Sequence, residues 1–180
     1  MRIIGGRLQR RQLPVNSRLP VRPTTDMAKE ALFSILNNHF EFSEISVLDL
    51  FAGTGSISIE FASRGAIEVI AVDNNVKCHA HIKDISTKFE VDNLKVVKAD
   101  AIHFLEICKQ SFNIIFADPP FDFENTLKVA ELVMNSNLLE NEGWLIIEHP
   151  KEIKMNHIPG FFDKRNYGKV NFSFFKKSNI

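Results

Sequence analysis

The chain has 180 residues, 44% of them hydrophobic and 24% charged, and its formal net charge is zero. This length and composition are typical of one domain with a full core, and no stretch reaches the roughly 18 consecutive apolar residues of a membrane helix. The N-terminus lacks the apolar core of a signal peptide, so we expect a cytoplasmic protein without a membrane role. The two cysteines, Cys78 and Cys108, have no metal-ligand spacing, and we expect reduced thiols and no metal site.

The first 25 residues are strongly basic. They hold no acid and six arginines, namely Arg2, Arg7, Arg10, Arg11, Arg18 and Arg22, whereas the remainder holds 16 basic and 22 acidic residues. The planar fork of arginine matches phosphate and stacks on bases. We therefore predict a nucleic-acid-binding N-terminal arm at 1–25 and a separate domain at 26–180. A solvated tail, or an arm that packs on the acidic body, is the alternative.

Two elements are predicted near the N-terminus. Short apolar runs on either side of Gly5 and Gly6 predict a hairpin or a bulged strand. The stretch RPTTDMAKEALFSILNN (22–38) predicts a helix, which Thr24 or Thr25 can cap. The expected apolar stripe of this helix consists of Met27, Ala31, Leu32, Ile35 and Leu36.

From residue 46 onward, short apolar runs alternate with amphipathic segments. Strands are expected within 46–53, 67–73, 94–100, 112–118 and 143–149, and helices within 56–65, 75–89, 101–109 and 124–136. Residues 167–177 are expected to add one or two strands as an antiparallel hairpin at the edge. This alternation predicts an α/β fold with a doubly wound, Rossmann-like and mostly parallel sheet.

Four of these strands end in an acid or a glycine loop: Asp49 and FAGTGS (51–56) close the first, and Asp73, Asp100 and Asp118 end the next three. A single aspartate after a strand is commonly a turn former or a helix cap. In a doubly wound sheet, however, ligands bind outside the carboxyl ends of the strands. Four acids at one edge therefore predict a ligand site there.

The glycine turn after the first strand indicates the kind of ligand. Gly53 and Gly55 allow close backbone approach, and Asp73 follows Gly53 by 20 residues, the spacing at which an acid binds ribose hydroxyls. The third glycine of a dinucleotide motif is missing, and Asp49 would repel a pyrophosphate. A dinucleotide oxidoreductase is therefore disfavoured, and a cationic ligand with a ribose, such as S-adenosylmethionine (SAM), is favoured. The candidate cofactor residues are Asp49, Phe51, Ala52, Gly53, Thr54, Gly55, Asp73, Asn74, Asp100 and Ala101.

The stretch DPPF (118–121) ends the fourth strand abruptly, because proline cannot donate to a sheet ladder. Methyl transfer to an exocyclic amine of a nucleobase needs alignment and acceptors for its N–H bonds. Asp118 offers a carboxylate, Pro119 and Pro120 fix the backbone so that a carbonyl can point the same way, and Phe121 offers a ring for base stacking. A strand stop with a core phenylalanine is the alternative interpretation.

The sequence resembles a known family. DPPF is similar to the (N/D)-P-P-(Y/F/W) motif of amino-directed, SAM-dependent methyltransferases, and VLDLFAGTGSISIEFASRGA (47–66) resembles their glycine-rich motif. MRIIGGRLQRRQLP (1–14), RPTTDMAKEALFSIL (22–36) and DPPF, in this order, resemble RsmD-type enzymes, which are bacterial 16S ribosomal RNA guanine-N2 methyltransferases.

The resemblance implies a class I methyltransferase fold with an RNA-contacting N-terminal arm, SAM as methyl donor, and 16S rRNA that already carries ribosomal proteins as substrate. It implies Asp49, Gly53 and Gly55 at the methionine end, Asp73 at the ribose, Asp100 at the adenine, and Asp118, Pro119 and Phe121 around a flipped base. Arg22 and Thr24 would lie where the arm meets the active site. Nothing in the sequence demands a dimer.

Three alternatives to this assignment stay open at the sequence level. DPPF alone also fits DNA adenine and protein glutamine methyltransferases, and the chain could be a non-catalytic RNA-binding protein.

Ser56 and Ser58 stand where small or apolar residues would serve equally. His149 follows the fifth strand, and a structural role is expected for it.

Overall fold

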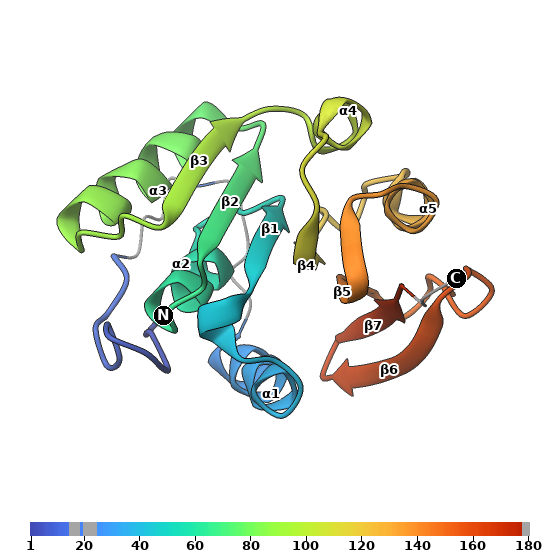
Figure 1. Ribbon diagram of the computed structural model, residues 1–180, viewed down its shortest axis with the longest axis horizontal. Coiled ribbons are helices and arrows are strands. Elements are labelled where there is room, and N and C mark those ends of the chain that lie inside the picture. The colour runs from blue at the N-terminus through green and yellow to red at the C-terminus, as the bar shows by residue number, and fades with distance from the viewer. Residues whose placement is uncertain (15–18, 20–24, 178–180) are drawn as a thin grey trace.

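The structure, a computed structural model, describes residues 1–14, 19 and 25–177. The predicted RNA-binding residues Arg18, Arg22 and Thr24 lie outside the described residues. The described part is built around one seven-stranded sheet with helices on both faces (Figure 1).

The strands have the order β3-β2-β1-β4-β5-β7-β6 across the sheet. Their bounds are Ser46–Leu50 (β1), Glu68–Asp73 (β2), Leu94–Lys98 (β3), Phe112–Ala117 (β4), Leu139–Pro150 (β5), Phe161–Tyr167 (β6) and Val170–Lys176 (β7). The first five pair in parallel, and β7 runs antiparallel between β5 and β6. The predicted doubly wound, mostly parallel α/β sheet with an antiparallel C-terminal hairpin is confirmed. The order reverses between β1 and β4, where such sheets bind ligands.

Within the described residues, five α-helices cover the two faces of the sheet. They are α1 (Asp26–Asn37), α2 (Ser56–Ser63), α3 (Val76–Lys88), α4 (Ala101–Ile107) and α5 (Thr126–Met134), with a 3-10 turn at Phe42–Glu44. Helices α1, α2 and α3 contribute to one hydrophobic core and α4 and α5 to the other (Figure 1). None of the described helices is long and apolar enough to cross a membrane.

Helix α1 begins as expected, and Leu32 and Leu36 of its predicted stripe are buried, but one edge of the buried face differs from the prediction. Thr25 is its N-cap, because its side-chain oxygen accepts a hydrogen bond from the backbone N–H of Ala28 at 3.3 Å. Met27 was predicted in the buried stripe, but it is 64% exposed and Ala28 is buried instead. The side chain of Lys29 is also buried, which the hydrophobic pattern did not predict.

The N-terminal segment packs on α2 and α3 (Figure 1). Ile3, Leu8 and Leu13 are buried in the same core as these helices, and a single antiparallel bridge joins Arg2 to Gln12. Gly6 has a φ of 75°, and a Cβ there would lie 1.9 Å from the carbonyl oxygen of Ser63. Residues 1–14 are therefore in close contact with the body of the protein.

A buried charge network holds this segment in place. The Lys29 ammonium donates to the carbonyl of Arg2 at 2.7 Å and to the Ser56 hydroxyl at 3.1 Å, and it lies 3.5 Å from the Glu60 carboxylate. The Glu60 carboxylate accepts the backbone N–H groups of Ile4 and Gly5, each at 2.8 Å. Buried charges are tolerated when they are paired and hydrogen-bonded. The network therefore fixes the N-terminal segment to α1 and α2.

Candidate active site

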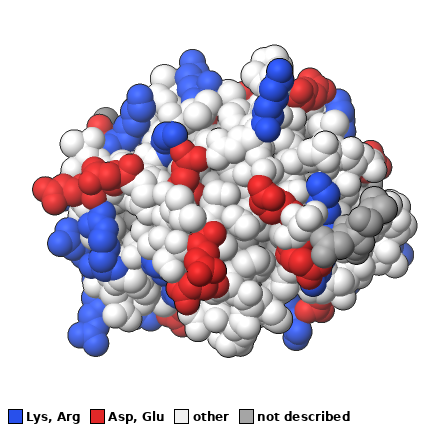
Figure 2. Space-filling model, viewed as in Figure 1, with Lys and Arg blue, Asp and Glu red and all other residues white. Residues whose placement is uncertain are grey.

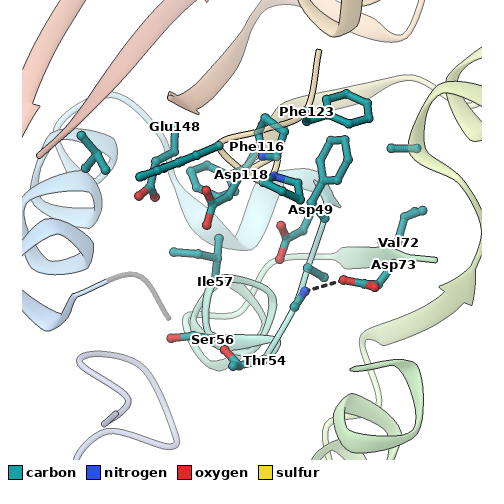
Figure 3. Close-up of a pocket in the computed structure, with 18 of the residues that line it drawn as sticks. Asp49, Thr54, Ser56, Ile57, Val72, Asp73, Phe116, Asp118, Phe123 and Glu148 are labelled. Carbon is teal, nitrogen blue, oxygen red and sulfur yellow. Dashed lines mark hydrogen bonds between the residues drawn. The ribbon is translucent and has the colours of Figure 1, made fainter. Parts of the chain in front are cut away.

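A cavity of about 620 Å³ opens at the carboxyl ends of the parallel strands, which is the size range of small-molecule and cofactor sites. Nearly all the predicted cofactor and catalytic residues line it: Asp49, Phe51, Ala52, Gly53, Thr54, Asp73, Asn74, Asp100, Ala101, Asp118, Pro119, Pro120 and Phe121. Figure 3 shows side chains from several loops pointing into this space. The fold thus brings together residues that lie up to 72 positions apart in the chain.

The loop between β1 and α2 forms one wall of the cavity. Its tight path uses the left-handed backbone region at Phe51, Gly53 and Gly55, with φ values of 61°, 55° and 75°. Gly55 is not among the lining residues, although the sequence predicted it at the cofactor. A Cβ at Gly55 would lie 2.9 Å from the Ile82 side chain of α3, so this glycine allows the loop and helix to pack closely.

Asp73 connects the end of β2 to this loop. One carboxylate oxygen accepts the backbone N–H of Gly53 at 2.8 Å (Figure 3), and the other accepts that of Asn75 at 2.8 Å. Each carboxylate oxygen has a second acceptor position. Asp73 can therefore hold the loop and also accept hydrogen bonds from ligand hydroxyls.

Asp49 is almost completely buried in β1 and accepts a hydrogen bond from the Ser58 hydroxyl. Burial raises the pKa of the Asp49 carboxyl to about 7, and the nearby Asp73 carboxylate adds to the rise. A cation bound beside Asp49 would stabilise its ionised form. The site therefore suits a positively charged ligand group at this point.

Asp100 caps a helix and also lines the cavity. Its carboxylate accepts the backbone N–H of His103 at 3.0 Å and so caps α4. Asp100 and Ala101 also line the cavity, on the side formed by the loop after β3.

The DPPF corner forms the opposite wall. Pro119 is buried and Pro120 is exposed, and the Pro120 carbonyl accepts the backbone N–H of Phe123 at 2.8 Å, which closes a turn. Phe121 is 49% exposed at the cavity, so the alternative of a core phenylalanine is wrong. Burial raises the pKa of Asp118 well above its usual value, and the negative charges of Glu148 and Asp49 raise it further.

Several lining residues were not predicted. The most prominent is Glu148 at the end of β5, which is 6% exposed and points into the same space as Asp118 (Figure 3). Its signal was present, because Glu148 lies near the end of a buried strand, as the four predicted aspartates do. A structural role was expected for the neighbouring His149. That histidine is fully buried, and its ring nitrogens lie 2.8 Å from the Pro150 carbonyl and 2.7 Å from the Ser173 hydroxyl, so its role is structural.

Other unpredicted lining residues come from segments distant in the sequence. They include Thr25, Met27 and Ala28 at the start of α1, Phe123 after the DPPF corner, and the β6–β7 turn at 167–170. The ring of Phe123 packs edge-on against Phe51, with centroids 5.1 Å apart. No single local motif marks these residues, because the turn and the helix reach the cavity only through the tertiary fold.

The described arginines of the N-terminal segment lie outside the cavity lining. Arg2 pairs with Glu30 at 2.7 Å, Arg7 donates to the backbone carbonyls of Phe89 and Glu90, and the Arg11 guanidinium lies 5.4 Å from the centre of the Phe89 ring. Arg2, Arg7, Arg10 and Arg11 remain exposed to solvent. On the face shown in Figure 2, basic and acidic side chains are interspersed. RNA contact by these arginines stays a prediction.

The strand order, the glycine loop after β1 and the acids at the following strand ends define the class I methyltransferase fold. The chain belongs to the family described as "Conserved hypothetical protein 95", which matches residues 1–176. The resemblance to RsmD-type enzymes is thereby confirmed.

Individual relatives cover most of the chain. "Ribosomal RNA small subunit methyltransferase D" of Escherichia coli (strain K12) is 37% identical over 150 residues, which are 82% of this chain and 71% of that protein. The YlbH protein of Bacillus subtilis (strain 168) is 30% identical over 184 residues, 98% of this chain and 99% of its own. The solved structure of yhhF from E. coli is 27% identical, covers 99% of this chain and 98% of that chain, and has a TM-score of 0.85.

Proposed function

We propose that this protein is an S-adenosylmethionine-dependent methyltransferase that methylates the exocyclic N2 amine of a guanine in 16S rRNA. One observation carries the proposal: the Asp118–Pro119 corner opens into the same cavity as Asp49 and Asp73 (Figure 3). The site therefore has a place for a cationic, ribose-bearing ligand and a place for an amine within one enclosed space. Family relatives named as ribosomal RNA small subunit methyltransferases support the choice of substrate.

The half of the cavity that contains Asp49, Asp73 and Asp100, called the donor half below, fits SAM. Asp49 would face its positively charged end, Asp73 would accept hydrogen bonds from its ribose hydroxyls, and Asp100 and Ala101 would lie against its adenine. When bound, SAM supplies an electrophilic methyl carbon on a sulfonium. The hydrogen bonds that Asp73 already makes to Gly53 and Asn75 hold this half in shape, which lowers the cost of binding.

The half of the cavity at the Asp118–Pro119 corner, called the acceptor half below, provides the hydrogen-bond acceptors that orient an exocyclic amine. The lone pair of such an amine is delocalised into the base, so the nitrogen must be oriented before it can form a bond to carbon. Asp118 would accept one N–H and the Pro119 carbonyl the other, which draws electron density toward nitrogen. The methyl group would pass from sulfur to nitrogen, so that the N–C bond forms as the S–C bond of the sulfonium breaks. The nitrogen would then be positive and would give up one proton, for which the Asp118 carboxylate is the proposed acceptor.

Phe121 is placed to hold the base itself. Its ring is half exposed beside Asp118, and stacking of one base on an aromatic ring contributes about 1–3 kcal/mol. This contribution offsets part of the few kcal/mol that extrusion of a base from its stack costs.

The proposal also covers how the protein binds RNA, which particle it acts on, its oligomeric state and its location. The exposed arginines of the N-terminal segment would contact RNA phosphates, and the segment at 1–25 would act as the RNA-binding arm of the catalytic domain. The proposed substrate is a small-subunit particle in which 16S rRNA already carries ribosomal proteins. The proposed enzyme acts as a monomer in the cytoplasm, where ribosomes assemble.

A direct test offers isotopically labelled SAM to the purified protein with four acceptors: unmethylated small-subunit particles, free 16S rRNA, double-stranded DNA and ribosomal protein. Nucleoside mass spectrometry should find labelled N2-methylguanosine from the particles. Label in N6-methyladenine of DNA or in a glutamine side chain would reject the proposed substrate. Label in none of the acceptors would reject the proposed activity.

A further inference from the structure

The turn between β6 and β7 reaches the mouth of the cavity. Residues 167–170 all line the cavity, and two of them, Gly168 and Lys169, are exposed to solvent. In Figure 1 the turn points toward α1, the helix whose first residues line the cavity as well. The turn is therefore part of the rim that a substrate passes on its way in.

The strand pairing places this turn beside the acceptor half. Val170 is in register with Pro150 at the end of β5, and Ile147 of β5 is in register with Ala117 at the end of β4. The donor half lies at β1, β2 and β3, on the other side of β4 in the strand order. The turn thus faces the corner at which the proposed base is held.

The hairpin itself holds the turn in position. Tyr167 pairs with Val170, so only Gly168 and Lys169 connect the two strands. Gly168 has a φ of 63°, in the left-handed region that glycine takes in tight hairpin turns. The side-chain amide of Asn166 donates across the hairpin to the Val170 carbonyl at 3.1 Å. The backbone of Lys169 is therefore well placed to present its side chain at the cavity mouth.

Lys169 is a positive charge beside a group of carboxylates. Among the described residues that line the cavity it is the only lysine or arginine, and it makes no hydrogen bond or ion pair with the described part of the chain. Its charge is thus available to a binding partner. Four aspartates line the same cavity: Asp49, Asp73, Asp100 and Asp118.

RNA would bring further negative charge to this mouth. When a base leaves its stack and enters an active-site cavity, its phosphates stay on the backbone outside. Carboxylates in the cavity repel those phosphates, whereas an ammonium group at the mouth attracts one and offers it three N–H donors. A lysine at this point therefore favours the approach of an RNA backbone to an otherwise acidic cavity.

We propose that Lys169 binds a phosphate next to the target guanosine, which makes the β6–β7 turn an RNA contact separate from the N-terminal arm. This inference rests on the proposed function and adds to it the contact that holds the backbone of the extruded nucleotide. Because Lys169 is exposed, its ion pair with a phosphate is screened by salt. The dependence of binding on salt is therefore its clearest signature.

The first test measures how the affinity for unmethylated small-subunit particles depends on salt. Loss of one contact to a single-stranded phosphate reduces the slope of log K against log salt concentration by about 0.7. Lys169→Gln should show this reduction and a KM for the particles about 2- to 5-fold higher at low salt, with kcat and SAM affinity unchanged. Lys169→Arg keeps the charge and should restore the slope. Lys109→Gln, at an exposed lysine before β4 and so at the opposite end of the strands, is the matched control and should have the wild-type slope.

A second test locates the phosphate. Particles are assembled on RNA that carries a neutral methylphosphonate on the 5′ or the 3′ side of the target guanosine. For the wild type, one of these two changes should weaken binding about as much as Lys169→Gln does. For Lys169→Gln, the same change should weaken binding no further, because the two partners of one contact do not contribute independently.

Three results would overturn the assignment of Lys169. They are an unchanged salt slope in Lys169→Gln, effects of Lys169→Gln and of both methylphosphonates that simply add, and a loss of SAM binding in Lys169→Gln, which would place the turn at the donor half. Each of these results leaves the proposed function intact as long as the wild type methylates guanine. An absence of guanine methylation by the wild type would instead overturn the proposed function.

Discussion

The two halves of the cavity differ in how their carboxylates are satisfied. On the side of β1 and β2, Asp73 accepts two backbone N–H groups and Asp49 accepts the Ser58 hydroxyl. On the side of β4 and β5, Asp118 faces the negative charges of Glu148 and Asp49. In the first half, donors of the protein hold the carboxylates in place, whereas in the second half burial and neighbouring negative charges act on the Asp118 carboxyl. This difference supports our proposal that the first half holds the cofactor and the second half the base.

The largest effect is expected from Asp118→Ala, which removes the side-chain acceptor together with its charge. Loss of one preorganised charge-stabilising group typically costs about 10²–10³-fold in kcat. Methyl transfer to small-subunit particles should fall by about that factor, while SAM affinity measured by calorimetry stays unchanged. Asp122→Ala, at an exposed position four residues along, is the control and should be as active as the wild type. A fully active Asp118→Ala would show that the Asp118 side chain does not hold the amine.

Asp73→Ala should weaken the binding of SAM, because it changes the side of the cavity formed by β1 and β2. It removes the proposed ribose acceptor and the hydrogen bonds to Gly53 and Asn75. Hydrogen bonds to charged groups contribute about 1.5–3 kcal/mol, so the Kd for SAM should rise about 10- to 150-fold. Asp84→Ala, on the exposed face of α3, is the control. Unchanged SAM affinity in Asp73→Ala would remove the distinction between the two halves.

Phe121→Ala tests whether the exposed ring binds the base. Removal of about 1–3 kcal/mol of stacking should raise KM for the RNA particle about 5- to 150-fold and leave SAM affinity unaltered. Phe121→Trp keeps an aromatic face and should retain most of the activity. If Phe121→Ala and the wild type have the same kinetics, the base does not stack there.

A separate prediction concerns the pH dependence of stability without ligand. Since the pKa of Asp49 is raised to about 7 in the folded protein, the folded state keeps a proton that the unfolded state loses above the ordinary value of 3.8. The free energy of unfolding should therefore fall with rising pH between about 4 and 7, by at most about 1.4 kcal/mol per pH unit from this group. Asp49→Asn removes that loss and preserves an acceptor for Ser58.

Chemical denaturation of Asp49→Asn and the wild type at several pH values measures this difference. The stability of the variant relative to the wild type should increase as the pH rises from 5 to 7. A constant difference would mean that Asp49 is ionised throughout, and that no cation is needed to balance it.

The sequence predicted the alternation of strands and helices because the apolar runs of β1, β2, β4 and β5 are almost continuous, as buried parallel strands require. It predicted the site because strand ends of such a sheet share one edge. Gly55 lies outside the cavity lining, and its spacing in the sequence cannot distinguish contact with a ligand from contact with Ile82. Met27 was predicted to be buried but is exposed, because one edge of the buried face of the helix includes the charged Lys29 instead.

Glu148 was missed although its pattern matched that of the predicted acids. The proximity of Asp118 and Glu148 depends on which strands are neighbours, and the sequence does not state that β4 lies next to β5 in register. Similarly, the packing of the N-terminal segment on α2 depends on Lys29 and Glu60, whose burial no hydrophobic pattern reveals.

A structure of the protein with bound SAM measures the central claim most directly. The methyl carbon of the donor should point toward the corner formed by Asp118, Pro119 and Phe121, with the ribose at Asp73. A donor methyl group that points away from this corner, or a donor bound outside the cavity, would contradict the account.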